Sequence, residues 1–120
     1  MKRAIYLTLI LFTLISCNKE FLEDVYDEPG YAMGKVNSSV SVTFGVQYNY
    51  SYFVGSTEYK GNKKAVGINQ GETSIVGRHY LVVYKLSEPK KSDMNFKYYI
   101  KSERDFLDLL EKFKNNPPKP

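Results

Sequence analysis

The stretch Arg78 to Leu86, "RHYLVVYKL", decides the fold. Apolar side chains occupy both its odd and its even positions, and a strand directs successive side chains to opposite faces of a sheet. A strand of this kind must have both of its faces covered. The stretch therefore predicts a β-strand at the centre of a sheet, with packed side chains above and below it.

The residues before this strand alternate between apolar and polar with a period of two, which is typical of strands that have one wet face. Residues 36–44 and 46–54 are two such runs, and Gly45 separates them. Gly55-Ser56 then provides a turn signal, so residues 47–60 predict a hairpin. The sequence thus places antiparallel strands ahead of the central one.

The segments on either side of the central strand contain the turn signals. "GNKKAVGINQGE", residues 61–72, is polar and glycine-rich and predicts a loop with a short strand around residues 65–68. After the central strand, residues 87–93 contain Pro89 and predict a turn. Residues 95–101 predict the last strand, whose shared apolar face would consist of Phe96, Tyr98 and Ile100.

A helix is predicted over residues 103–114. Ser102 suits the N-cap position, acidic residues follow it, and lysines stand near the other end. An apolar stripe recurs at helical spacing, in Phe106, Leu109, Leu110 and Phe113. The expected fold class is mainly β (α+β), a small antiparallel sheet or partly open barrel over residues 31–116 with one C-terminal α-helix that covers the sheet. Residues 117–120 form a proline-rich tail.

The start of the chain has the pattern of a secretory signal peptide, which we place at residues 1–16. Lys2 and Arg3 carry positive charge, and residues 4–15 are almost wholly apolar. Twelve residues rise only about 18 Å as a helix, against a hydrocarbon core of roughly 30 Å. A permanent transmembrane span is therefore not expected here.

The segment Leu14-Ile15-Ser16-Cys17 resembles the lipobox of bacterial lipoproteins. The resemblance implies a diacylglycerol thioether on the Cys17 sulfur, cleavage before Cys17 and acylation of the new amino terminus, for example by palmitate. A signal peptide that is simply removed is the alternative. Asn18 is not the aspartate that resembles an inner-membrane retention signal, so a cell envelope location at the outer membrane is favoured, with the leaflet left open.

Charge is distributed unevenly along the chain. The formal net charge is +4, yet residues 17–30 hold one lysine and five acids, whereas residues 31–120 hold fourteen lysines and arginines against eight acids. We expect residues 17–30 to be an extended acidic tether that lifts a basic domain away from anionic lipid. A linker whose charge has no role is the alternative.

Enzyme chemistry is poorly represented in the sequence. His79 is the only histidine, no metal-binding or nucleophile-elbow motif occurs, and the glycines form no nucleotide-binding pattern. The carboxylates that could serve as an acid and base pair lie in polar or turn-adjacent stretches; they are Glu58, Glu72, Glu88 and Asp93. We therefore expect no catalytic residues, no metal and no cofactor, with a hydrolase as a remote alternative.

Two features suggest a binding surface. Tyr48, Tyr50 and Tyr52 share one strand face and could stack on sugar rings or peptide side chains, or they could be core residues under the C-terminal helix. The second feature is a basic segment that could contact an anionic polysaccharide; it contains Lys60, Lys63 and Lys64. Export from the cytoplasm argues against nucleic acid as the ligand.

A second resemblance concerns the middle of the chain. Val76-Gly77-x-x-Tyr80-x-Val82-x-Tyr84, after a hairpin that ends in Tyr59-x-Gly61, is similar to a group of small uncharacterised exported β-domains of bacteria. This resemblance implies a compact antiparallel sheet or small barrel and no particular activity. We expect a monomeric, non-enzymatic module that binds an envelope protein or a glycan, or alternatively an inhibitor lipoprotein that acts on a toxin or hydrolase.

Overall fold

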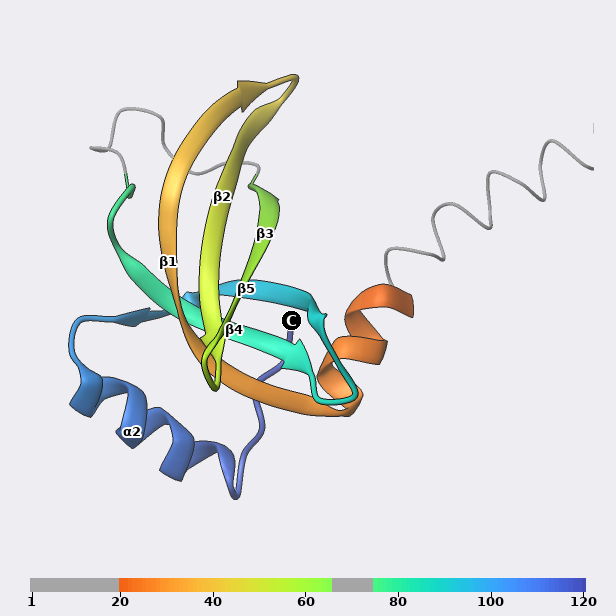
Figure 1. Ribbon diagram of the computed structural model, residues 1–120, viewed down its shortest axis with the longest axis vertical. Coiled ribbons are helices and arrows are strands. Elements are labelled where there is room, and N and C mark those ends of the chain that lie inside the picture. Colours follow the sequence, from red (N-terminus) through yellow and green to blue (C-terminus); the bar gives the residue numbers. More distant parts are fainter. Residues whose placement is uncertain (1–19, 66–74) are drawn as a thin grey trace, which may run out of the picture.

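A computed structural model describes residues 20–65 and 75–120. Five antiparallel strands form one sheet in the order β3-β2-β1-β4-β5 within these residues (Figure 1). The strands are β1 (Pro29–Val42), β2 (Gly45–Val54), β3 (Thr57–Ala65), β4 (His79–Lys85) and β5 (Glu88–Ile100), and helix α2 (Glu103–Phe113) follows them. The predicted fold class, an antiparallel sheet with a C-terminal helix, is confirmed.

The sheet is curled, so its two edge strands approach each other. Side chains of β2 reach across the opening to the edge strand β5. The Tyr52 hydroxyl donates a hydrogen bond to the Pro89 carbonyl at 2.5 Å, and the hydroxyl oxygens of Tyr50 and Ser92 lie 2.8 Å apart. The sheet is thus a partly open barrel, held together at its opening by side chains.

The strand β4 is buried on both faces, as its sequence predicted. Leu81, Val82 and Val83 are each 0% exposed. The middle position of the sheet belongs to β1, however, because this longer strand pairs with β4 along its first half and with β2 along its second half. The expected central strand is therefore an inner strand beside the middle one.

Two apolar clusters lie on opposite sides of the curled sheet. The inner cluster fills the concave side with residues that include Val36, Tyr50, Tyr52, Val82 and Met94. The outer cluster lies under the helices on the other side, and its buried members are Val25, Leu81, Val83, Ile100 and Phe113. Alternation along β4 therefore supplies one cluster with Val82 and the other with Leu81 and Val83.

Helix α2 begins and packs as its sequence predicted. The Ser102 hydroxyl accepts a hydrogen bond from the Asp105 amide at 3.2 Å, and Glu103 and Asp105 occupy the first turn. Phe113 is buried on the outer face of the sheet, where its ring centroid lies 5.1 Å from that of Tyr31 and 5.3 Å from that of Tyr98. The helix thus covers the β4–β5 side of the sheet.

The N-cap offers a first test of this account. Ser102→Ala should lower the free energy of unfolding by about 1 kcal/mol, because the Asp105 amide loses its acceptor. Ser102→Asp should retain most of the stability, since aspartate is also a good N-cap. Urea denaturation followed by circular dichroism measures both variants, and equal losses in the two would contradict the capping role.

Residues 20–30 differ from the expected extended tether. Residues 20–27 are helical, and β1 begins at Pro29. Val25 is 0% exposed beneath this helix, and the Asp24 carboxylate lies 2.6 Å from the Lys85 amine. The expectation of an extended segment is wrong here, because Lys85 and Lys91 of the β4–β5 hairpin pair with Asp24, and Val25 is buried beneath the helix.

The region around β5 also differs from its prediction. The turn contains only Leu86 and Ser87, and residues 88–93, predicted as part of the turn, belong to β5. Pro89 is tolerated because β5 is an edge strand. The predicted loop and short strand beyond Ala65 lie outside the described residues, whereas residues 61–65 are part of β3.

A bulge in β5 separates side chains that were expected to share a face. Tyr80 pairs with Tyr99, but the next residue, Leu81, pairs with Asn95, so extra residues of β5 loop out between these pairs. Phe96 consequently packs in the inner cluster, whereas Tyr98 and Ile100 join the outer one. The prediction of one shared face is therefore wrong.

Candidate functional site

The outer side of β1, β2 and β3 carries a continuous set of polar side chains that we call the polar face. Cross-strand pairing aligns Ser38, Asn49 and Asn62 in one row and Lys35, Ser51 and Lys60 in the next. The polar face consists of these six residues together with Asn37, Gln47 and Lys64. It results from the alternation in β2, which turns the tyrosines inward and their polar neighbours outward.

Hydrogen bonds between side chains order the polar face. The Asn37 amide nitrogen donates to the Ser51 hydroxyl at 2.9 Å, and the Asn49 amide nitrogen donates to the Ser38 hydroxyl at 3.0 Å. An amide has two N–H donors and a carbonyl acceptor, so each of these groups can also contact a ligand. A hollow of about 370 Å³ lies over this region, lined by residues that include Asn37, Asn49, Lys60 and Asn62.

The polar face is positively charged. Lys35, Lys60 and Lys64 are exposed, and no ion pair within residues 20–65 and 75–120 joins any of them to a carboxylate. Glu58, further along β3, is the one acidic residue on this side of β2 and β3. Unpaired lysines around neutral amides favour ligands that combine hydroxyl groups with negative charge.

The tyrosines proposed as a stacking surface are buried. Tyr48, Tyr50 and Tyr52 are 6%, 1% and 1% exposed, and the Tyr52 ring stacks on those of Tyr59 and Tyr84 with centroids 5.7 and 6.2 Å away. Burial raises the pKa of Tyr50, and the charge of a nearby aspartate adds to the rise. The stacking prediction is wrong, because these rings fill the inside of the barrel, on the side of the sheet opposite α2.

The three lysines predicted as one basic segment are divided between two sides. Lys60 and Lys64 point outward from β3, whereas Lys63 points toward the barrel opening. There its amine lies 2.8 Å from the Asp93 carboxylate and 5.7 Å from the centre of the Phe96 ring. Lys63 is therefore part of the closure between β3 and β5, and only Lys60 and Lys64 belong to the polar face.

Sequence reasoning missed a buried polar cluster next to this closure. The Tyr26 hydroxyl donates to one carboxylate oxygen of Asp93 at 2.6 Å, and the Lys63 amine donates to the other. The Asn95 amide nitrogen donates to the Tyr26 hydroxyl at 3.1 Å and to the Lys119 carbonyl at 3.0 Å. The sequence places Asp93 in a polar, turn-adjacent stretch, but its side chain is buried in the structure, where the residue is 6% exposed. Both of its oxygens accept hydrogen bonds that tie the N-terminal helix and β3 to β5.

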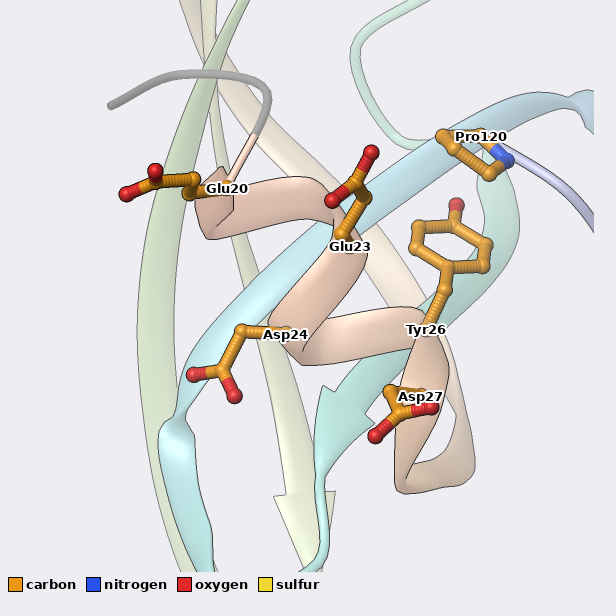
Figure 2. A pocket seen from close by; sticks show the side chains of 6 residues that line it. All are labelled: Glu20, Glu23, Asp24, Tyr26, Asp27 and Pro120. Carbon is orange, nitrogen blue, oxygen red and sulfur yellow. The ribbon is translucent and has the colours of Figure 1, made fainter. Parts of the chain in front are cut away.

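An acidic hollow of about 610 Å³ lies between the helix of residues 20–27 and the end of the chain (Figure 2). Its lining includes Glu20, Glu23, Asp24 and Asp27, whose carboxylates point in different directions in Figure 2. No group of acidic, histidine or cysteine side chains in the described part of the chain is arranged to hold a metal ion. The hydrogen bond from Lys85 lowers the pKa of Asp24. Asp24 thus has a structural role, as the partner of Lys85.

His79 and Cys17 were also singled out from the sequence. His79 is the half-buried first residue of β4, where it pairs with Lys35 of the polar face on one side and with Ile100 of β5 on the other. Cys17 lies outside the described residues. None of the helices in the described ranges is long and apolar enough to span a bilayer. No family model, curated protein or solved structure matches this chain.

Proposed function

We propose that this chain is a lipid-anchored cell envelope protein, attached through Cys17, and that it is a non-enzymatic module whose polar face binds an acidic glycan. The observation that carries the binding proposal is the polar face itself: ordered amide and hydroxyl side chains on an exposed sheet surface, surrounded by lysines that form no ion pair with any residue the structure describes. The proposed anchor rests on the lipobox resemblance.

The chemistry of the polar face matches a charged sugar polymer. Asparagine and glutamine amides can donate to one sugar hydroxyl and accept from its neighbour. The exposed amines of Lys35, Lys60 and Lys64 would pair with carboxylate or sulfate groups along the polymer. Rows of side chains spaced along and across strands offer repeated contacts to a repeating ligand.

We infer that the polar face is directed away from the proposed anchor. Glu20, where the described helix begins, is three positions after Cys17, so the anchor point lies within about 11 Å of that helix. Strand β1 begins just after the helix, runs for 14 residues and carries the polar face on its far half. A domain held close to the membrane by Cys17 would thus present this face toward the surrounding envelope.

Replacing the three lysines of the polar face tests the binding proposal. The triple variant Lys35→Gln, Lys60→Gln and Lys64→Gln should bind alginate, an acidic polysaccharide, at least about tenfold more weakly than the wild type, which corresponds to about 1.4 kcal/mol. Added salt should also weaken wild-type binding more than that of the variant, because exposed charges are screened. Biolayer interferometry on immobilised alginate measures both effects.

A matched control separates this face from net charge alone. The triple variant Lys90→Gln, Lys112→Gln and Lys114→Gln removes the same charge from exposed positions elsewhere. It should bind alginate almost as well as the wild type. Equal losses in the two triple variants, or wild-type binding no tighter to alginate than to neutral dextran, would refute the proposal.

A further inference from the structure

Within residues 20–65 and 75–120, strand β1 has an open edge over its second half. Its pairing with β4 extends from Pro29 to Lys35, and backbone hydrogen bonds to Gly77 and Arg78 continue as far as Val36. From Ser38 to Val42, β1 pairs with β2 alone among the described residues. Figure 1 shows the β1–β2 hairpin extending beyond the part of the sheet where β4 and β5 lie.

The register identifies which backbone groups face this edge. Thr43 and Phe44 form a two-residue turn, and Val42 pairs with Gly45 across it. Pairs next to such a turn are hydrogen-bonded, and hydrogen-bonded pairs alternate with non-bonded ones along an antiparallel ladder. Val42 and Val40 therefore direct their N–H and C=O groups to β2, whereas Ser39 and Ser41 direct theirs to the open edge.

This edge lacks the residues that normally prevent strands from pairing with other chains. Residues 36–57 contain no charged residue and no proline. The other two edges of the sheet are different: β3 carries Lys60, Lys63 and Lys64, and β5 carries Pro89 and three lysines. Natural sheets use lysine and proline to protect exposed edges, and residues 38–42 of β1 form the one edge among these three that lacks both, which points to an edge that accepts a partner strand.

We propose that the partner is a second copy of this chain, which pairs antiparallel on the same edge, in place of the monomer expected from the sequence. In this arrangement Ser39 and Ser41 of one copy exchange backbone hydrogen bonds with Ser41 and Ser39 of the second copy, and Val40 lies directly opposite Val40 of the second copy. The strand is complementary to itself under a two-fold axis, because it brings no like charges together. Val40, 51% exposed in the single chain, gains an apolar neighbour.

The arrangement has two consequences. Two short strands bury less than the roughly 1,200 Å² of a stable interface, so the dimer should dissociate on dilution in detergent and be favoured when both copies share one membrane. Because directly opposed side chains lie on the same side of a sheet, the two polar faces join into one surface. This second consequence rests on the proposed glycan binding, whereas the dimer itself does not.

Disulfide trapping tests the pairing in full-length protein that also carries Cys17→Ser. Opposed residues of a non-hydrogen-bonded antiparallel pair have Cα atoms about 4.5 Å apart, which a disulfide can bridge. Val40→Cys should therefore form a covalent dimer under mild oxidation of the purified protein at high concentration. The control is Phe53→Cys, at a position on β2 that is 59% exposed and away from the edge, and it should remain monomeric.

Analytical ultracentrifugation in detergent, without any glycan, provides the second arm. The wild type should sediment at twice the mass of its single chain at high concentration, Val40→Lys should sediment at the single mass, and Phe53→Lys should behave like the wild type. A wild type that stays monomeric at every concentration, or a Val40→Cys variant that cross-links no more than Phe53→Cys, would overturn the proposal. Loss of glycan binding would change neither result, so the two proposals fail separately.

Discussion

Replacing Tyr50 by alanine should lower the free energy of unfolding by about 3–5 kcal/mol, as is typical of large aromatic residues removed from a core. Tyr50 is 1% exposed, and its ring lies 6.0 Å from that of Tyr52 inside the barrel. An added Cβ at Gly61 would lie only 2.6 Å from the end of the Tyr50 ring, which shows how closely the ring fills this space. Urea denaturation measures the loss.

Two further variants separate packing from hydrogen bonding and from exposure. Tyr50→Phe retains the ring but loses the contact with the Ser92 hydroxyl, so it should cost about 1 kcal/mol. Phe53→Ala, on the same strand but exposed, should change stability by less than about 0.5 kcal/mol. A Tyr50→Ala variant as stable as the wild type that has lost alginate binding would contradict this account and restore the tyrosines as a binding surface.

Cys17→Ser should abolish acylation of the chain and release it from membranes. Two or three acyl chains on one residue hold a protein stably at a bilayer, whereas serine provides no thiol for the thioether. Metabolic labelling with palmitate should lose its signal completely, and the protein should move from the detergent phase to the aqueous phase in Triton X-114 partitioning. Both effects are all-or-none, unlike the graded effects of the other variants.

A neighbouring substitution serves as the control for the anchor. Asn18→Gln leaves the lipobox intact and should retain both the acyl label and the detergent-phase partitioning. Unchanged labelling of Cys17→Ser would refute the anchor. A native chain that mass spectrometry shows to begin at Met1, or to begin at Cys17 with a free thiol, would refute it as well.

Local patterns predicted the elements whose stabilising contacts are themselves local. The apolar run at residues 80–83 identified a strand buried on both faces, Gly55-Ser56 marked the β2–β3 turn, and Ser102 marked the start of α2. The helix of residues 20–27 was missed because its stabilising partners are distant in sequence. Lys85, which pairs with Asp24, comes about sixty residues later, and charge counting cannot locate such a partner.

The sequence likewise predicted only part of the candidate site. Alternation correctly placed Tyr48, Tyr50 and Tyr52 on one side of β2, but it could not show which side the curled sheet would enclose. Lys63 was separated from Lys60 and Lys64 because the segment extends β3 instead of forming a loop. The sequence did not predict Lys35 as a site residue, because only the β1–β2 register brings it beside Ser51.

A chemical-shift titration tests most directly whether the outer side of β1–β3 binds the ligand while the inner side is core. Alginate oligosaccharides added to isotope-labelled protein should shift the amide signals of Asn37, Asn49, Lys60 and Asn62, which line one hollow. Signals of the buried inner cluster should stay in place. Shifts confined to Glu23, Tyr26 and Asp27 of the acidic hollow, or no shifts at saturating ligand, would contradict the claim.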